Sequence, residues 1–249
     1  DIRRDFNEKF VSGDGTVSGN SQTAYLLALK MNLLPTEELR QKAAAKLVGR
    51  IEASDGHLTT GFLGVSYLCP VLSEAGYSDI AYRLLLTETY PSWLYSVVNG
   101  ATTIWERWNS YIAETGQFGD AGMNSFNHYS YGSIGEWMYR YSAGIEYDEE
   151  NPGYKHIIIQ PNPGRELSYV KGSYDSVYGT IESNWTMNGD AFALDVVIPS
   201  NTTATVYLPS DDAGALTVDD AAYAPGSAGA EGVTYVGEEG GKAIFEIES

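Results

Sequence analysis

The sequence is poor in cysteine, histidine and basic residues, and each shortage excludes a class of protein. Cys69 is the one cysteine among 249 residues, so an intramolecular disulfide framework is excluded. Its place in an apolar stretch predicts a buried, unreactive thiol. The three histidines stand far apart, at positions 57, 128 and 156, and no CxxC pair is present. We therefore expect neither a metal site nor a cofactor.

Positive charge and long apolar runs are also scarce. The chain has 33 acidic and 15 basic side chains, which gives a formal net charge of −18. Nucleic acids and anionic membrane surfaces are bound by clustered Lys and Arg, so we expect neither as a partner. No apolar run approaches the roughly 20 residues that cross a bilayer.

The remaining composition is that of a folded protein. Hydrophobic residues make up 43% of the chain, which is too many for a disordered one, and 249 residues allow one or two domains. Aromatic residues are plentiful, with 19 Tyr, 7 Phe and 5 Trp. Such a surplus is compatible with a sugar-binding surface, although most aromatic residues in any protein lie in the core.

The first part of the chain has helical periodicity. Five helices are expected, over about 21–34, 36–51, 66–75, 78–88 and 129–143. Ala24, Leu27, Ala28 and Met31 form one apolar stripe of the first helix, which Pro35 is expected to end. Thr36 is expected to cap the second helix, and Gly76 and Gly144 to end the third and the fifth. Long loops rich in Gly, Ser, Thr and aromatic residues join these helices, and such loops commonly carry function.

From residue 155 onward the pattern is that of strands. They are expected over 156–159, 169–172, 179–187, 191–198, 203–208 and 242–247. Asn188-Gly189 between two of them is a strong hairpin signal. The expected fold is therefore α+β with two domains, a helical domain over 1–150 and an antiparallel β-sandwich over 151–249.

Two stretches could carry chemistry. The first is residues 93–109, where Glu106 stands between Trp105 and Trp108. A carboxylate against indole rings is partly desolvated, which suits general acid or base work, and aromatic faces stack on sugar rings. The alternative is a surface pair of Glu106 with Arg107, with both tryptophans in the core.

The second stretch is residues 124–132, just before the fifth helix. Asn127, His128, Tyr129 and Tyr131 offer hydrogen-bonding groups near a helix N-terminus. A single histidine in such a place acts either in a site or as a capping or core residue.

Four segments in this order resemble bacterial α-L-rhamnosidases, the inverting glycoside hydrolase family 78. They are Gln22-Thr23-Ala24-Tyr25, Thr60-Gly61-Phe62-Leu63-Gly64, Ala101-Thr102-Thr103-Ile104-Trp105-Glu106-Arg107-Trp108 and Ser125-Phe126-Asn127-His128-Tyr129. The resemblance runs along the whole chain and implies the latter part of an (α/α)6 catalytic barrel followed by the C-terminal β-sandwich. It implies hydrolysis of terminal α-L-rhamnosyl residues without a cofactor.

The resemblance also assigns roles to individual residues. Glu106 looks like the general base that activates water, and His128 looks like the histidine that contacts the bound rhamnose. Trp105 and Asn127 are their expected neighbours in the substrate site. The family's general acid comes from an acidic motif earlier in the barrel, and that motif has no counterpart in this chain.

Three further expectations follow. The chain opens inside a helix-like segment, which indicates a fragment that lacks the N-terminal half of its barrel and is inactive alone. The open barrel edge favours a homo-oligomer or a partner that supplies the missing half. The resemblance to bacterial enzymes leaves both periplasmic or extracellular and cytoplasmic locations open.

Two other hypotheses for the function of this chain remain. The chain could belong to a carbohydrate-binding or scaffold protein that kept the toroid and the sandwich without the reaction. It could also belong to another (α/α)-toroid enzyme, such as a polysaccharide lyase, in which Tyr and His transfer the protons.

Overall fold

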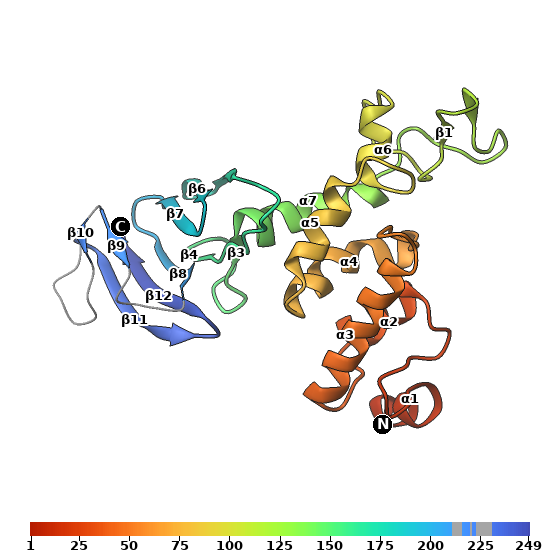
Figure 1. Cartoon of the computed structure of the whole chain (residues 1–249). Coiled ribbons are helices and arrows are strands. Elements are labelled where there is room, and N and C mark those ends of the chain that lie inside the picture. Colours follow the sequence, from red (N-terminus) through yellow and green to blue (C-terminus); the bar gives the residue numbers. More distant parts are fainter. Residues whose placement is uncertain (211–215, 220, 223–230) are drawn as a thin grey trace. The chain divides into compact units, whose positions relative to one another are not determined.

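The computed structural model describes residues 1–210, 216–219, 221–222 and 231–249, and it divides the chain into two units, Asp1–Gly135 and Glu136–Ser249 (Figure 1). The first unit is built from helices and the second mainly from sheets. Within the described residues, none of the helices combines the length and the hydrophobicity that a membrane crossing requires.

The first unit, all of whose residues are described, contains six α-helices, one short hairpin and the beginning of a last helical run. The six helices are α1 (Ile2–Phe10), α2 (Gln22–Lys30), α3 (Glu37–Glu52), α4 (Phe62–Glu74), α5 (Ser78–Leu86) and α6 (Trp93–Val98), with the hairpin of β1 (Tyr111–Ile112) and β2 (Gln117–Phe118). Cys69 on α4 is buried as expected, and this burial raises the pKa of its thiol.

The helix boundaries follow local capping signals. The Thr36 hydroxyl accepts a hydrogen bond from the Leu39 N–H at 3.2 Å, which confirms it as the N-cap of α3. Gly76, just beyond α4, has a φ of +85°, the left-handed conformation that ends helices. Other boundaries differ from expectation: α2 ends at Lys30, α4 begins at Phe62, and residues 93–98 form α6, which is not among the five expected helices. Ser92 caps α6, its hydroxyl accepting from the Tyr95 N–H at 3.0 Å.

The apolar stripe of α2 coincides only in part with the face that the helix buries, since Ala28 is buried while Ala24 and Leu27 are half-buried. Its buried residues are Gln22, Tyr25, Leu26, Ala28 and Leu29, whereas Met31 lies beyond the helix and is 51% exposed. The reason is that α2 packs against both α3 and α4, so two adjacent faces of one short helix are covered. Periodicity within nine residues does not distinguish one covered face from two.

The expected fifth helix is a run of three helix types. It passes from a 3-10 helix η1 (Ser130–Ser133) through α7 (Ile134–Trp137) into a π-helix η2 (Met138–Ala143). Gly144 ends the run with a φ of +81°, as predicted.

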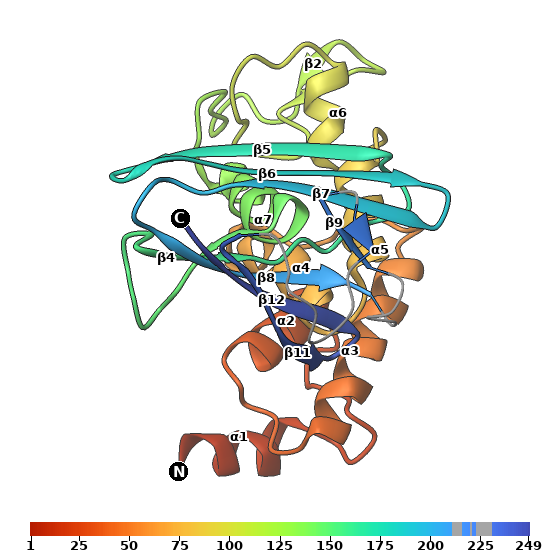
Figure 2. The ribbon, with the colours of Figure 1, turned by 90° about the vertical axis from the view of Figure 1, so that its left-hand side faces the viewer.

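The second unit contains two main sheets, seen as layers in Figure 2. One has the order β11-β12-β8-β4-β3, formed by β3 (Ile145–Tyr147), β4 (His156–Ile159), β8 (Thr203–Pro209), β11 (Val233–Glu239) and β12 (Lys242–Glu248). The other has the order β5-β6-β7, formed by β5 (Tyr169–Ser176), β6 (Gly179–Asn188) and β7 (Ala191–Val197). A short pair, β9 (Thr217–Val218) with β10 (Ala221–Ala222), completes the described strands.

The predicted strands are confirmed, with one difference in pairing. Asn188 faces Ala191 across the predicted hairpin, and Gly189 has a φ of +64° in its turn. Against the expectation of a wholly antiparallel sandwich, β4 and β8 run parallel. The chain leaves β4, builds the whole three-stranded sheet and returns to the same end, and only such a long crossover allows a parallel neighbour.

The core of the second unit lies between its two sheets. Ile157 and Phe245 from one sheet share a hydrophobic cluster with Ile181 from the other. Trp185 on β6 is fully buried, and its Nε1 donates to the Ser142 carbonyl at 2.7 Å. This bond fixes the three-stranded sheet to the end of η2.

Candidate functional site

Two loop segments of the first unit, residues 103–106 and 125–128, are paired through hydrogen bonds. The Glu106 N–H donates to the Ser125 carbonyl at 2.9 Å, and the His128 N–H donates to the Ile104 carbonyl at 2.9 Å. The Thr103 hydroxyl also donates to the backbone of the facing segment. Glu106 and His128, 22 positions apart in the sequence, are therefore carried by two neighbouring loop segments, which together form the loop pair.

The Glu106 carboxylate is held by the backbone and not by a cation. Its Oε2 accepts a hydrogen bond from the Ser125 N–H at 2.7 Å, and its side chain is half-buried. Arg107 turns away and pairs with Asp120 at 3.2 Å, so the alternative of a Glu106–Arg107 surface pair is wrong. Hydrogen bonds from the Gly122 and Met123 N–H groups, and then the charge of Arg107, lower the pKa of Asp120. Among the described residues, Glu106 is thus free of ion pairs and keeps one carboxylate oxygen unbonded.

The His128 imidazole is fixed by its aromatic neighbours. Its ring lies parallel to that of Phe62, with centroids 4.7 Å apart, and to that of Tyr129, at 5.4 Å. Nδ1 accepts a long hydrogen bond of 3.4 Å from the Ser130 N–H. In the described part of the chain Nε2 has no partner, so it is available to a ligand.

Trp93, Trp108 and Tyr131 form a cluster of contacting rings, here called the aromatic column. Trp108 stacks on Tyr131 with centroids 3.7 Å apart, and Trp93 meets Trp108 edge-on at 5.5 Å. The Trp108 Nε1 donates to the Thr60 carbonyl at 3.0 Å, and the Trp93 Nε1 donates to the Tyr131 carbonyl at 2.9 Å. Burial, above all, raises the pKa of Tyr131. Both indole N–H groups are satisfied, so the column is a rigid support.

The N-terminus of α2 holds the loop before α4. The buried Gln22 carboxamide donates to the His57 carbonyl at 3.0 Å and accepts from the Thr59 N–H at 2.8 Å. The hydroxyls of Thr23 and Thr60 lie 3.0 Å apart. The Thr60 carbonyl accepts the hydrogen bond from Trp108 Nε1, and this bond connects the loop to the rest of the site. All four segments that carry the family resemblance therefore contact one another in turn.

Trp105 and Asn127 occupy different positions on the loop pair. Trp105 is only 6% exposed and meets Phe126 edge-on at 5.4 Å. Asn127 is exposed, and its N–H donates to the Ser125 hydroxyl at 3.1 Å. Sequence reasoning did not select Phe62, although it stands in one of the four segments. Its contact with His128 spans 66 positions and leaves no signal in local spacing.

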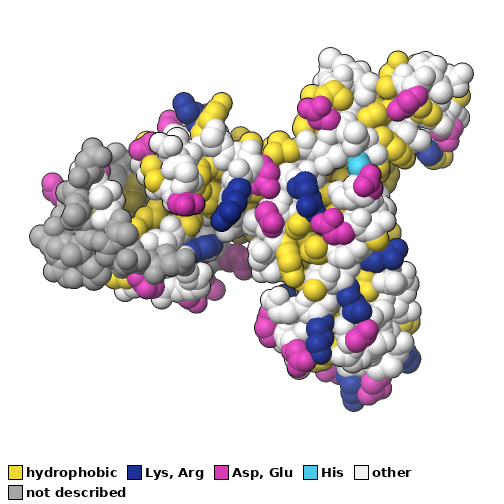
Figure 3. Space-filling model, in the orientation of Figure 1, with side chains coloured by type: hydrophobic (Ala, Val, Ile, Leu, Met, Phe, Trp, Pro, Cys, Tyr) yellow, Lys and Arg dark blue, Asp and Glu magenta, His cyan; other side chains and the backbone are white. Residues whose placement is uncertain are grey.

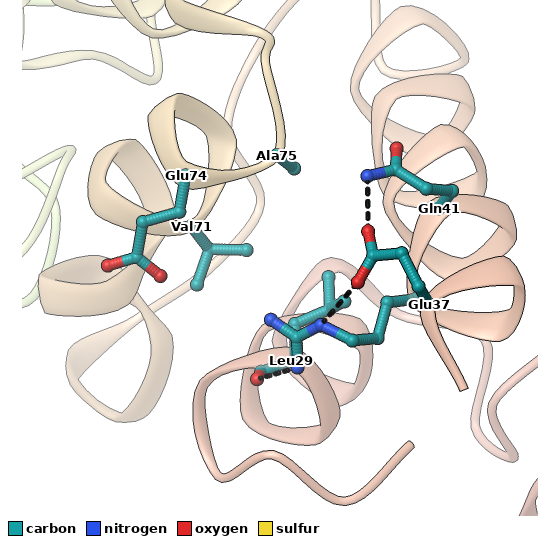
Figure 4. A pocket seen from close by; sticks show the side chains of 7 residues that line it. Leu29, Glu37, Gln41, Val71, Glu74 and Ala75 are labelled. Atoms are coloured by element: carbon teal, nitrogen blue, oxygen red, sulfur yellow. Dashed lines mark hydrogen bonds and ion pairs between the residues drawn. The ribbon is translucent and has the colours of Figure 1, made fainter. Parts of the chain in front are cut away.

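Elsewhere in the first unit a hollow of about 100 Å³ lies where α2, α3 and α4 meet (Figure 4). Its polar side chains pair with one another, as in the 2.7 Å hydrogen bond from the Gln41 amide to Glu37. Glu37 also lies 3.5 Å from the Arg40 Nε. We interpret this hollow as a helix contact. Across the described residues, no three His, Cys, Asp or Glu side chains come together as a metal site.

Comparison with protein families shows two adjoining matches. Residues 1–142 match the bacterial alpha-L-rhamnosidase 6 hairpin glycosidase domain, and residues 144–221 match the bacterial alpha-L-rhamnosidase C-terminal domain.

Individual relatives agree with these matches. An alpha-L-rhamnosidase of Streptomyces avermitilis is 44% identical over 248 residues, which is 100% of this chain and 22% of that protein. One of Formosa agariphila is 46% identical over 206 residues, covering 83% of this chain and 22% of that protein.

Solved structures show the same likeness. The crystal structure of the Streptomyces avermitilis alpha-L-rhamnosidase complexed with L-rhamnose superimposes with a TM-score of 0.85 at 42% identity, covering 99% of this chain and 22% of that one. The native alpha-L-rhamnosidase of Aspergillus terreus does so with a TM-score of 0.79 at 36% identity, covering 84% of this chain and 24% of that one. The chain thus spans about a fifth of the length of its relatives.

Proposed function

Because the chain belongs to the family of the bacterial alpha-L-rhamnosidase 6 hairpin glycosidase domain, we propose that it forms part of an inverting glycoside hydrolase. The enzyme releases terminal α-L-rhamnose from glycosides or polysaccharides. The observation that carries the proposal is the pairing of residues 103–106 with residues 125–128, which places Glu106 and His128 on one loop pair.

Glu106 is the general base. Its Oε2 is oriented by the Ser125 N–H, and its other oxygen is unbonded among the described residues, as an oxygen that takes a proton from water requires. The absence of an ion pair with Arg107, which bonds Asp120 instead, keeps the carboxylate available. The water attacks the anomeric carbon on the face opposite the leaving group.

The second carboxyl group of the reaction comes from another part of the barrel, outside residues 1–249. Inverting glycosidases separate their two carboxyl groups by roughly 6.5–9.5 Å, which leaves room for the attacking water. The general acid protonates the glycosidic oxygen while Glu106 takes the proton of the water. On this proposal the chain holds half of the catalytic pair and does not hydrolyse rhamnosides alone.

His128 binds the sugar. Stacking on Phe62 fixes its ring plane, and its unbonded Nε2 is presented to a rhamnose hydroxyl. Asn127 is exposed beside it and adds a second polar contact. Trp105 is too deeply buried to stack on the substrate, so its part in the site is to hold the Glu106 segment in place.

The rest of the barrel covers an apolar face formed by α1 and α2. A hollow of about 350 Å³ there is lined by Phe6, Phe10, Ala24, Leu27, Ala28 and Leu33, with Ser18 and Gly19. α1 has no buried residue of its own. In the isolated chain a second copy covers this face, since exposed apolar patches of this kind favour association. Sedimentation of the isolated chain as a monodisperse monomer would contradict this part of the proposal.

The test is hydrolysis of an aryl α-L-rhamnoside by the longer polypeptide in which this chain is joined to the rest of its barrel. Glu106→Gln should lower kcat by about 10²–10⁴-fold with KM nearly unchanged, the range that general acid–base catalysis supplies. Glu114→Gln is the matched control, because this glutamate is exposed in the β1–β2 turn. Proton NMR of the first product should show β-L-rhamnose, the inverted anomer.

Three results would overturn the proposal. Full activity of Glu106→Gln, with activity lost in His128→Asn, would indicate proton transfer by histidine, as in a lyase. Absence of turnover by the wild type would indicate a binding protein. Initial release of the α-anomer would exclude inversion.

A further inference from the structure

A cavity next to the proposed catalytic loop pair is not used by the mechanism above. It has a volume of about 320 Å³, and its lining runs from the residues that follow α6 to Tyr111 on β1. Trp105, Tyr111 and Phe126 form its aromatic wall, and residues 99–103 form the rest. Trp105 belongs to both the cavity wall and the proposed site, but Glu106, Asn127 and His128 do not line the cavity.

The residues of the aromatic wall differ in exposure, since Trp105 is buried and Phe126 is partly open to solvent. Trp105 meets Tyr111 edge-on at 6.5 Å and Phe126 edge-on at 5.4 Å. Trp105 is 6% exposed, whereas Phe126 is 36% exposed and presents part of its ring to solvent. Figure 3 shows hydrophobic side chains at the surface of this lobe, which carries α6 and β1. Such a ring can cover the apolar face of a flat ligand.

The rest of the lining, residues 99–103, offers hydrogen bonds and no charge. The backbone N–H groups of Thr102 and Thr103 have no partner among the described residues. The Thr103 hydroxyl donates to the Phe126 carbonyl and so ties this part of the lining to the aromatic wall. The Asn99 amide nitrogen is bound to the Tyr95 carbonyl at 2.8 Å, which leaves its oxygen as an acceptor among the described residues.

The lining selects for a neutral ligand that is rich in hydroxyl groups. None of the described residues that line the cavity is charged, so an anion or a cation finds no counter-ion there. The volume lies at the lower end of the roughly 300–1,000 Å³ that small-molecule sites occupy, which fits one sugar ring. We propose that this cavity binds a neutral pyranose unit, as a second carbohydrate site beside the catalytic loop pair.

The test is an NMR titration of the 249-residue chain with methyl α-D-glucopyranoside. This probe is a neutral pyranose that the rhamnose site is not proposed to hold. Binding should shift the amide signals of Thr102 and Thr103, and Phe126→Ala should weaken it at least about tenfold, as expected for loss of a stacking aromatic residue.

Phe118→Ala is the matched control. Phe118 is also an exposed phenylalanine, and its ring lies 5.5 Å from that of Phe126, but it does not line the cavity. This variant should bind the probe as the wild type does. Methyl α-D-glucopyranosiduronate, the same glycoside with an ionised carboxylate at C6, should not shift the same amides.

The site is distinguishable from the proposed catalytic function. His128→Asn should leave binding of the glucoside unchanged, whether or not Glu106 proves to be the base. Binding that survives Phe126→Ala and is lost in His128→Asn would place the sugar at the loop pair and overturn the inference. Absence of amide shifts at millimolar glucoside and equally at millimolar methyl α-L-rhamnopyranoside would overturn it as well.

Discussion

Gln22 offers the sharpest test of how the site is held together. It is 1% exposed on α2, and its carboxamide bridges the His57 carbonyl and the Thr59 N–H at 3.0 and 2.8 Å. Gln22→Met keeps nearly the same volume and removes both hydrogen bonds. It therefore leaves one donor and one acceptor of the loop without a protein partner.

The magnitude follows from the exposure of the two groups left behind. A buried polar group without a partner costs about 1–3 kcal/mol. Thr59 is exposed and His57 is half-buried, so water replaces part of each bond and the lower end applies. Together we expect about 2 kcal/mol, which corresponds to roughly a 30-fold change in an equilibrium constant.

Amide hydrogen exchange and urea unfolding measure this cost. The Thr59 amide should exchange roughly 30-fold faster in Gln22→Met, since its opening free energy falls by that amount. Gln41→Met is the matched control, because the Gln41 amide makes one exposed hydrogen bond to Glu37, and its loss should change stability by less than about 0.5 kcal/mol. Equal exchange of Thr59 in wild type and Gln22→Met would refute the argument.

Three further outcomes are expected. Trp185→Phe should lower the free energy of unfolding by about 2–4 kcal/mol in urea, because it shrinks a fully buried ring and removes the hydrogen bond from Trp185 Nε1 to the Ser142 carbonyl; a loss below about 0.5 kcal/mol would contradict this. The hydrogen bond from Lys46, followed by those from its own turn, lowers the pKa of Asp14 from its ordinary value of 3.8 to about 2. Any stability from its charge is therefore present above pH 3.8 and lost as the pH falls through about 2; a carboxyl NMR titration should show this pKa rising in Lys46→Met, and an unchanged value would exclude the pairing. Burial of Cys69, which raises the pKa of its thiol, should make it resist iodoacetamide at pH 8 in the native chain but not in urea, whereas rapid labelling of the native chain would show that the thiol is accessible and contradict its burial on α4.

Local signals in the sequence were enough for most element boundaries. Thr36, Gly144 and the Asn188-Gly189 turn act on backbone groups within a few residues of themselves, so their effect is readable without knowledge of the fold. The strand ranges follow for the same reason, since side-chain alternation is a local property. The family resemblance pointed to Glu106 and His128 as site residues, and their catalytic roles stay predictions.

Contacts between distant segments were not readable in this way. The buried face of α2 depends on two neighbouring helices, and the parallel pairing of β4 with β8 depends on where the intervening sheet returns the chain. The stacking of Phe62 on His128 likewise joins residues from separate loops.

The sequence alone therefore accounts for the helical and sheet halves of the chain, their caps and turns, and the residues that carry the family resemblance. Tertiary packing accounts for the environment of those residues: the backbone bond that orients Glu106, the turn of Arg107 towards Asp120, and the aromatic rings that fix His128. The physical reason is the distance along the chain over which each kind of interaction acts. Caps and turns satisfy nearby backbone groups, whereas the site is made by hydrogen bonds and ring contacts between segments that come together only when the whole unit folds.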